Sequence, residues 1–155
     1  MTPIRTTLAL VALTAGMAMP APVLADDALR PAVDARQAQF TLLAFNLSVV
    51  GQMAQGRIAY DAEAAQIAAD NMAAIASLHQ GRHFPAGSDR ASMEGTRALP
   101  AIWDTPDDFA ERFEALRSAT AALQTAASVD LASLQGAVRG VAGACQACHQ
   151  NYRGD

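Results

Sequence analysis

Apolar residues recur three and four positions apart along most of the chain beyond residue 30, and no stretch alternates like a half-buried strand. Such spacing puts side chains on one face of an α-helix, so the pattern predicts amphipathic helices and argues against a sheet. Four segments carry it: about 31–55, about 62–80, from 105 onward, and from about 130 to the end. Short links join three of them, so we predict an all-α fold, an antiparallel up-down-up-down four-helix bundle.

Local signals mark where these helices begin and end. Pro31 and Pro106 each suit the first position of a helix, where a missing N–H costs nothing. Asp61 is the expected N-cap of the second helix, because its carboxylate can accept from free backbone N–H groups. Gly56 and Gly81 are the expected terminators of the first and second helices.

The second helix and the loop that follows it carry two further expectations. The inward face of this helix is predicted to hold Ile67, Asn71 or Met72, Ile75 and Leu78. Residues 81–104 form a loop of about 24 residues, which a helical turn near 99–103 would shorten. A loop this long in a compact domain is usually functional or has packing of its own.

The first 25 residues resemble a secretory signal. Arg5 supplies a positive start, an apolar run begins at Leu8, and Val23-Leu24-Ala25 fits the small-x-small rule, so we predict cleavage between Ala25 and Asp26. The apolar run is too short for a convincing membrane span. The mature protein, residues 26–155, would be one exported domain. All basic residues are arginines, and without Arg5 the remaining 10 face 15 acidic residues, a charge of −5 that disfavours nucleic acid and anionic membranes.

The last turns of the chain hold the motif Cys145-x-x-Cys148-His149. Positions i, i+3 and i+4 share one helix face, so two thiols could add to the two vinyl groups of one haem. The histidine would then lie beneath the iron as an axial ligand. The motif therefore predicts one covalently attached haem c, with His149 as the metal ligand. The export signal agrees with this, because bacteria attach this haem outside the cytoplasm.

Three other uses of the motif stay open. A thioredoxin-like redox pair would need a strand before the motif, and none is expected here. A zinc site would need further ligands, for which His79 and His83 are the other histidines in the chain. A disulfide within the helix is the third alternative.

Only six residues follow His149, so a sixth iron ligand would have to come from upstream. The candidates are Met53, Met72, Met93, His79 and His83. In an antiparallel bundle the start of the first helix lies near the end of the fourth, which puts Arg36, Phe40 and Leu43 opposite the haem. None of these three ordinarily ligates iron. We therefore predict a five-coordinate iron with an apolar distal side, and we expect Met53 and Met72 to be core.

Four stretches resemble cytochrome c′, the class II c-type cytochromes of the bacterial periplasm. Residues 145–153 resemble the terminal C-x-x-C-H-x-x-Y-R, and residues 36–40 the Arg-Gln run of the first helix. Residues 84–88 resemble a Phe-Pro-x-Gly-Thr/Ser loop, and residues 101–109 the start of the third helix. The resemblance covers essentially the whole mature chain and implies the same four-helix bundle.

The resemblance also implies roles for individual residues. Cys145 and Cys148 would be the thioether residues and His149 the proximal ligand. Arg36 and Gln37 would hydrogen-bond a haem propionate, which suits a cation inside an otherwise apolar helix stripe.

Two more positions follow from the resemblance. Phe40 would take the distal position, where members with methionine are six-coordinate electron carriers and members with an apolar residue are five-coordinate. Arg153 would lie by the proximal pocket, where NO can displace the histidine.

These expectations favour a periplasmic protein that binds NO or CO and can transfer one electron. Phe40 offers no hydrogen-bond donor, so O₂ should bind less well. A dedicated electron carrier, with an unidentified redox partner, is the alternative. An enzyme ranks last, because no distal histidine or carboxylate is expected. Family members are commonly homodimers through helices one and two, whose outward faces are expected to carry Ala44, Val49, Ala59, Ala64 and Ala74.

Overall fold

The computed structural model describes residues 23–155, with side chains described from residue 28. Its elements are α1 (Val23–Ala54), α2 (Ala62–Ala76), the 3₁₀ turn η1 (Gln80–Arg82), α3 (Ala101–Asp104), α4 (Pro106–Ala126) and α5 (Leu131–Tyr152). The predicted signal peptide lies almost wholly outside these residues, so its cleavage stays a prediction. Within the described part no strand forms, and Ala98 and Arg153 make one isolated β-bridge.

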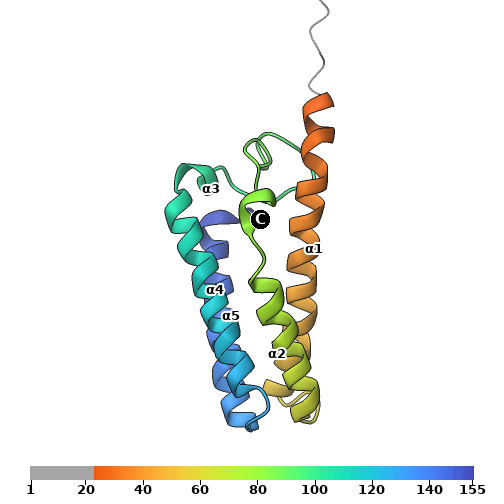
Figure 1. Ribbon diagram of the computed structural model, residues 1–155, viewed down its shortest axis with the longest axis vertical. Helices are drawn as coiled ribbons and strands as arrows, with labels where there is room; N and C mark the ends of the chain where they lie inside the picture. The colour runs from red at the N-terminus through yellow and green to blue at the C-terminus, as the bar shows by residue number, and fades with distance from the viewer. Residues whose placement is uncertain (1–22) are drawn as a thin grey trace, which may run out of the picture.

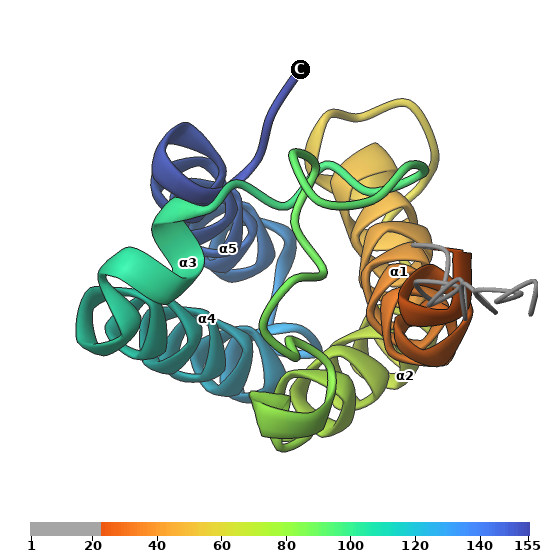
Figure 2. The same ribbon diagram turned by 90° about the horizontal axis from the view of Figure 1, so that it is seen from above.

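The four long helices run alternately down and up in chain order (Figure 1). Viewed along the bundle, α1, α2, α4 and α5 stand at four corners, and each packs against the next, with α5 closing the ring on α1 (Figure 2). The predicted antiparallel four-helix bundle is confirmed. None of the helices between residues 23 and 155 has the length and hydropathy to cross a bilayer.

Aspartate side chains begin two of the helices. Asp61 Oδ1 accepts hydrogen bonds from the backbone N–H groups of Glu63 and Ala64, both at 3.0 Å. Asp130 does the same for α5, accepting from the N–H of Ser133 at 2.7 Å. The first turn of a helix leaves such N–H groups without a partner, so these caps set where the helices start. The predicted N-cap at Asp61 is confirmed.

The start of α1 differs from the prediction. The helix begins at Val23, so Pro31 lies inside it and not at its first position. An internal proline leaves one carbonyl without its N–H partner, which is tolerable here because Pro31 is exposed and water can reach it. The other end agrees: the helix stops at Ala54, and Gly56 has a φ of 69°, which a residue with a Cβ rarely adopts.

The inward face of α2 agrees with the prediction at Met72, which is buried, and at Ile75, which packs against the core, but not at Ile67 and Leu78. Ile67 is 56% exposed and Leu78, beyond the end of the helix, is 45% exposed. The buried positions are instead mostly alanines, namely Ala65, Ala68, Ala69 and Ala76, together with Met72. Small side chains let neighbouring helices approach closely, so α2 turns its alanines inward and leaves larger apolar groups outside. The positions of the large apolar residues in the sequence therefore do not show which face of α2 is buried.

The outward faces of α1 and α2 agree with the expectation in part. Ala44 and Ala74 are exposed on their helices, and Ala59 is exposed on the segment between them. Val49 and Ala64 are instead partly buried and pack against the core, so the expectation is wrong at these two positions. The large apolar side chains exposed on the two helices are Phe40, Leu42 and Phe45 of α1, with Ile67 of α2.

The core divides into two parts along the bundle. One half is aliphatic and holds residues such as Val50, Leu123 and Leu134. The other is an aromatic cluster at the end where α5 terminates, built from Ile102, Phe109, Phe113 and Tyr152, with Phe84 and Trp103 packed against it. Residues 77–100 cross this open end, and α3 supplies the short helical turn expected near 99–103. The space between the two parts is where the site lies.

Candidate cofactor site

A cavity of about 580 Å³ opens between α1, α4 and α5 at the aromatic end of the bundle. This volume lies in the usual range for a bound cofactor. Its apolar wall includes Phe40, Leu43, Leu47, Met72, Leu116 and the aromatic cluster. Its polar lining includes Arg36, Gln37, Thr96, Arg97, Arg112 and Arg153. The lining therefore combines the features that an apolar ring with charged carboxylate arms would need.

The three residues of the C-x-x-C-H motif line this cavity together. Cys145, Cys148 and His149 lie on consecutive turns of α5, and neither cysteine is in a disulfide. Burial raises the pKa of both thiols, for Cys148 to about 11. Thiols with so high a pKa stay protonated near neutral pH, whereas a reactive redox pair needs a thiolate. The environment therefore argues against the redox alternative.

The surroundings of the His149 ring favour its neutral form. Burial, followed by the positive charges of Arg153 and Arg97, lowers the pKa of His149. A neutral imidazole has a free ring nitrogen with which to bind a metal, and a cationic one has none. Arg153 NH1 lies 3.4 Å from His149 Nδ1. The sequence placed both residues here, but only the structure brings in Arg97.

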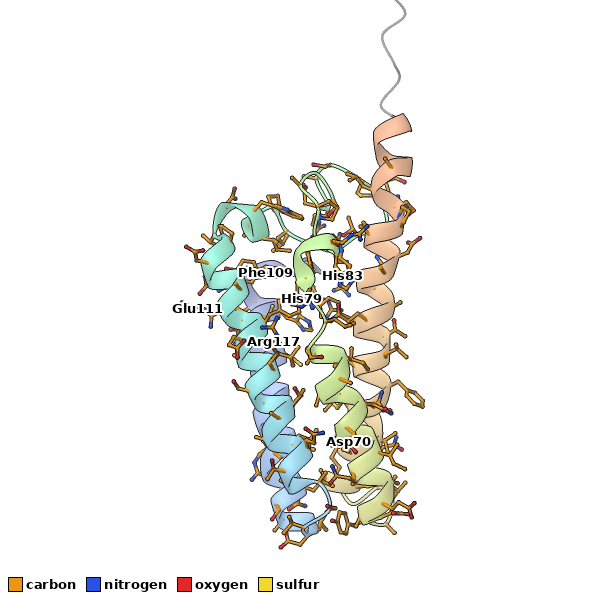
Figure 3. The ribbon with its side chains drawn as sticks, viewed as in Figure 1. Asp70, His79, His83, Phe109, Glu111 and Arg117 are labelled. Carbon is orange, nitrogen blue, oxygen red and sulfur yellow. The ribbon has the colours of Figure 1, made fainter. Side chains whose placement is uncertain are left out.

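Phe40 lines the cavity from α1, and the motif lines it from α5. Its ring centre lies 6.2 Å from that of Phe113, and its side chain is partly exposed. Among the upstream ligand candidates, all of them in the described part, Met72 alone lines the cavity. His79 and His83 belong to the segment after α2 (Figure 3). His83 Nδ1 lies 3.0 Å from the Gln39 side-chain oxygen, and His79 is exposed.

Arg36 is buried and holds the loop that crosses the cavity. Its NH1 donates to Ser88 Oγ at 2.7 Å and to the His83 carbonyl at 3.3 Å, and its NH2 donates to the Ser88 carbonyl and Thr96 Oγ1. Gln37 Nε2 donates to the Gly95 carbonyl at 2.6 Å. Both residues expected at a propionate therefore contact the loop, and a propionate contact stays a prediction for them.

Other residues at the cavity gave no signal in the sequence. Arg97 reaches it because its loop is tied to the chain end: Gly154 donates to the Arg97 carbonyl at 2.8 Å, and Arg97 Nε donates back to the Gly154 carbonyl at 2.9 Å. Arg112 lines the cavity while paired with Asp108 at 2.7 Å. Tyr152 also donates to Asp108. The Arg97–Gly154 and Tyr152–Asp108 contacts join residues far apart in the chain, so spacing could not predict them, whereas Arg112 and Asp108 lie four residues apart on one helix.

A family model described as Cytochrome C' matches residues 31–153. The chain belongs to the cytochrome c′ family. The family and the fold predicted from the sequence are thus confirmed.

Its relatives cover most of its length. Cytochrome c-554 of Cereibacter sphaeroides is 45% identical over 134 residues, which is 85% of this chain and 88% of that protein. Cytochrome c' of the same organism is 34% identical over 136 residues, 88% of this chain and 91% of the relative.

Solved structures agree with the fold. Cytochrome c' from a Rhodobacter species superposes with a TM-score of 0.80 at 31% identity, covering 82% of this chain and 98% of the other. A nitric oxide complex of a variant cytochrome c prime from Alcaligenes xylosoxidans superposes with a TM-score of 0.72 at 27% identity, covering 82% and 97%.

Members of this family carry haem c, and the two cysteines near the C-terminus suit covalent attachment. The side chains that line the cavity of this chain fit haem c. Two free thiols and a neutral histidine line one side of a cavity large enough for a cofactor, and arginines supply positive charge there. An apolar macrocycle with anionic carboxylates requires this combination.

Proposed function

We propose that this cytochrome c′ family member binds NO and CO at a five-coordinate haem iron. The observation that carries the proposal is that His149 on α5 and Phe40 on α1 line the same cavity. When bound, the haem supplies an iron that accepts a diatomic gas and exchanges one electron. A phenyl ring offers no lone pair for iron, so the side facing Phe40 is left to an external ligand.

The chain's own residues would hold and orient the group. Cys145 and Cys148 would each form a thioether through Sγ, and His149 would bind the iron through a ring nitrogen. Arg36 still has its Nε–H without an acceptor among the described residues, and Gln37 lies beside it. Arg97 uses Nε for Gly154, which leaves its terminal nitrogens for a carboxylate.

Gas selectivity would follow from the apolar wall. Bound O₂ depends on a nearby hydrogen-bond donor more than NO or CO does, and Phe40 has none. The nitric oxide complex of the Alcaligenes relative supports NO as a ligand in this fold. Because no carboxylate is among the described residues that line the cavity, and His149 faces it from the motif side, we propose a binding protein and not an enzyme. Its place would be the periplasm, as residues 1–25 predict.

Met72 favours a second candidate function. It is 1% exposed and lines the cavity from α2, so its thioether would supply the sixth iron ligand in this alternative. A six-coordinate iron reorganises little on reduction and would make the protein a dedicated electron carrier.

Optical spectroscopy of the protein matured with haem attached separates these candidates. We expect a broad high-spin ferrous spectrum that shifts sharply with CO and with NO. Phe40→Met should give a sharp low-spin spectrum with a weakened CO response, whereas Phe45→Met, on the exposed side of the same helix, should leave the spectrum unchanged. A sharp spectrum without a CO response in the unmodified protein would contradict the proposal. Recovery of CO binding in Met72→Leu would then identify Met72 as the sixth ligand.

A further inference from the structure

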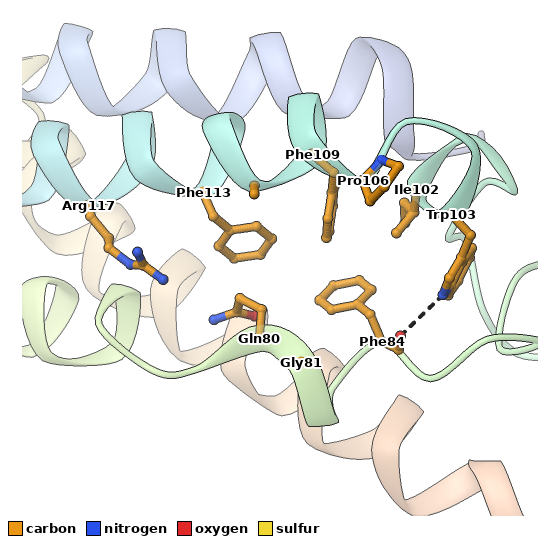
Figure 4. Close-up of a pocket in the computed structure, with 10 residues that line it drawn as sticks. Gln80, Gly81, Phe84, Ile102, Trp103, Pro106, Phe109, Phe113 and Arg117 are labelled. Carbon is orange, nitrogen blue, oxygen red and sulfur yellow. Dashed lines mark hydrogen bonds between the residues drawn. The ribbon is translucent and has the colours of Figure 1, made fainter.

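A second hollow, here called the outer pocket, lies between the segment Gln80–Phe84, α3 and α4 (Figure 4). Its volume is about 290 Å³. Four aromatic residues line it, namely Phe84, Trp103, Phe109 and Phe113, with Gln80 and Gly81 on the loop side. The pocket is apolar over most of its wall and is not part of the cofactor cavity.

The two hollows share a wall. Phe84, Ile102, Phe109 and Phe113 line both the outer pocket and the cofactor cavity. The ring centres of Phe84 and Phe113 lie 6.0 Å apart, and those of Phe84 and Phe109 lie 4.9 Å apart, in edge contacts. Such contacts are weak individually, so a modest rotation of one ring would join the two spaces.

A hydrogen bond holds the backbone of this wall at Phe84, whereas the aromatic rings touch one another only by packing. The indole N–H of Trp103 donates to the Phe84 carbonyl at 3.2 Å (Figure 4). The Arg36 guanidinium lies 5.1 Å from the Phe84 ring centre. The main chain of Phe84 is thus held in place, while its ring lies in the wall between the two hollows and can rotate.

We propose that the outer pocket holds small uncharged gas molecules on their way to the cofactor cavity. The inference rests on the proposed gas-binding function and adds a path by which the gas would reach the iron. Enclosed apolar cavities take up apolar guests such as xenon, and the mostly apolar wall of the outer pocket offers a guest the same kind of contact. A charged ligand is disfavoured, because Arg117 at the edge of the pocket already donates to Glu114 at 2.8 Å and to the Ala76 carbonyl at 3.3 Å.

Two small residues line the outer pocket, one on the loop side and one on α4. Replacing either with a larger residue should fill the pocket. Gly81 lines it from η1, where a Cβ would meet nothing within 4 Å and no positive φ forbids a side chain. Ala110 lines it from α4 at an exposed position. Gly81→Leu and Ala110→Leu therefore add bulk without strain, and Ala121→Leu, exposed on α4 away from both hollows, is the matched control.

The test has two arms on the haem-loaded protein. In crystals under xenon pressure we expect a xenon atom between Gly81 and Phe113, absent in Gly81→Leu and Ala110→Leu. In flash photolysis both variants should slow CO association by about tenfold, which corresponds to ~1.4 kcal/mol in the barrier, while Ala121→Leu matches the unmodified protein. An outer pocket without xenon, or xenon present with unchanged association rates, would overturn the inference. Failure of the unmodified protein to bind CO would instead overturn the proposed function, and the xenon arm alone would then decide whether the pocket accepts gas.

Discussion

Arg36 is a buried cation whose partners all come from one distant loop. Burial lowers its pKa, and the nearby carboxylate of Asp89 partly offsets that effect. The side chain is 3% exposed, and its terminal nitrogens meet acceptors between His83 and Thr96. A buried guanidinium is tolerated only when its donors are satisfied, so the loop and the arginine depend on one another.

Replacing Arg36 by alanine should therefore loosen the loop over the cofactor cavity. We expect Arg36→Ala to lower the free energy of unfolding by about 3 kcal/mol, since the Ser88 and Thr96 contacts are lost together. Arg139→Ala, on the exposed surface of α5, should change it by less than about 0.5 kcal/mol. Urea unfolding measures both. Equal effects of the two changes would show that the loop does not need Arg36.

The Asp130 cap gives a pH-dependent prediction. The N–H of Ser133 holds the pKa of this carboxyl below its usual range. A depressed folded-state pKa means that the cap stabilises the protein above the ordinary aspartate value of about 3.9 and loses its effect as pH falls through the lower folded value. Asp130→Ala should thus lower thermal stability at pH 7, and the difference should disappear in acid. Glu111→Gln, at an exposed position within α4, should show no such convergence.

At the scale of elements, α5 carries glycines that its helix does not require. Gly140 is exposed, and a Cβ built there meets nothing within 4 Å. We expect Gly140→Ala to raise the free energy of unfolding by about 0.5–1 kcal/mol, because alanine loses less backbone entropy on folding. Gly56→Ala should have the opposite sign, since Gly56 has a φ of 69°. Denaturant unfolding of both variants checks the pair, and a gain from Gly56→Ala would contradict the argument.

Helix boundaries and helix faces differed in how well the sequence predicted them. The cap at Asp61 and the terminator at Gly56 act within a few residues, so local chemistry revealed them. The face of α2 followed its spacing only at Met72 and Ile75, because alanine fits both a close helix contact and a solvent-exposed position, and only the neighbouring helices decide between them. Ile67 is outside for that reason.

At the scale of the whole molecule, an exposed apolar face lies over α1 and α2. Leu42 and Phe45 are 52% and 65% exposed and lie within one turn of Asn46, whose side-chain oxygen accepts from Asn71 of α2 at 3.1 Å. Ile67 lies one turn before Asn71 and is also exposed. Apolar side chains gathered along two helices are typical of an interface. We propose that this face forms the homodimer that the family resemblance led us to expect.

Phe45→Glu tests the dimer without touching the cofactor cavity. A carboxylate at a buried apolar contact should shift the protein to monomer at micromolar concentration, because the charge would lose its water. Val129→Glu is the control, since Val129 is equally exposed at 65% but lies between α4 and α5, at the far end of the bundle. Sedimentation velocity measures the change. A monomer before any substitution would contradict the proposal.

The sequence alone determined the four helices, the family and the cofactor, because each depends on the spacing of a few residues along one segment. Three and four residue repeats form helices, and Cys145, Cys148 and His149 share a face of α5 wherever that helix lies. Only the tertiary structure decided which side of α2 is buried, that Arg36 holds the loop, and that Arg97 reaches the cavity. Those features depend on contacts between residues distant in the chain, and such contacts form only when the helices pack.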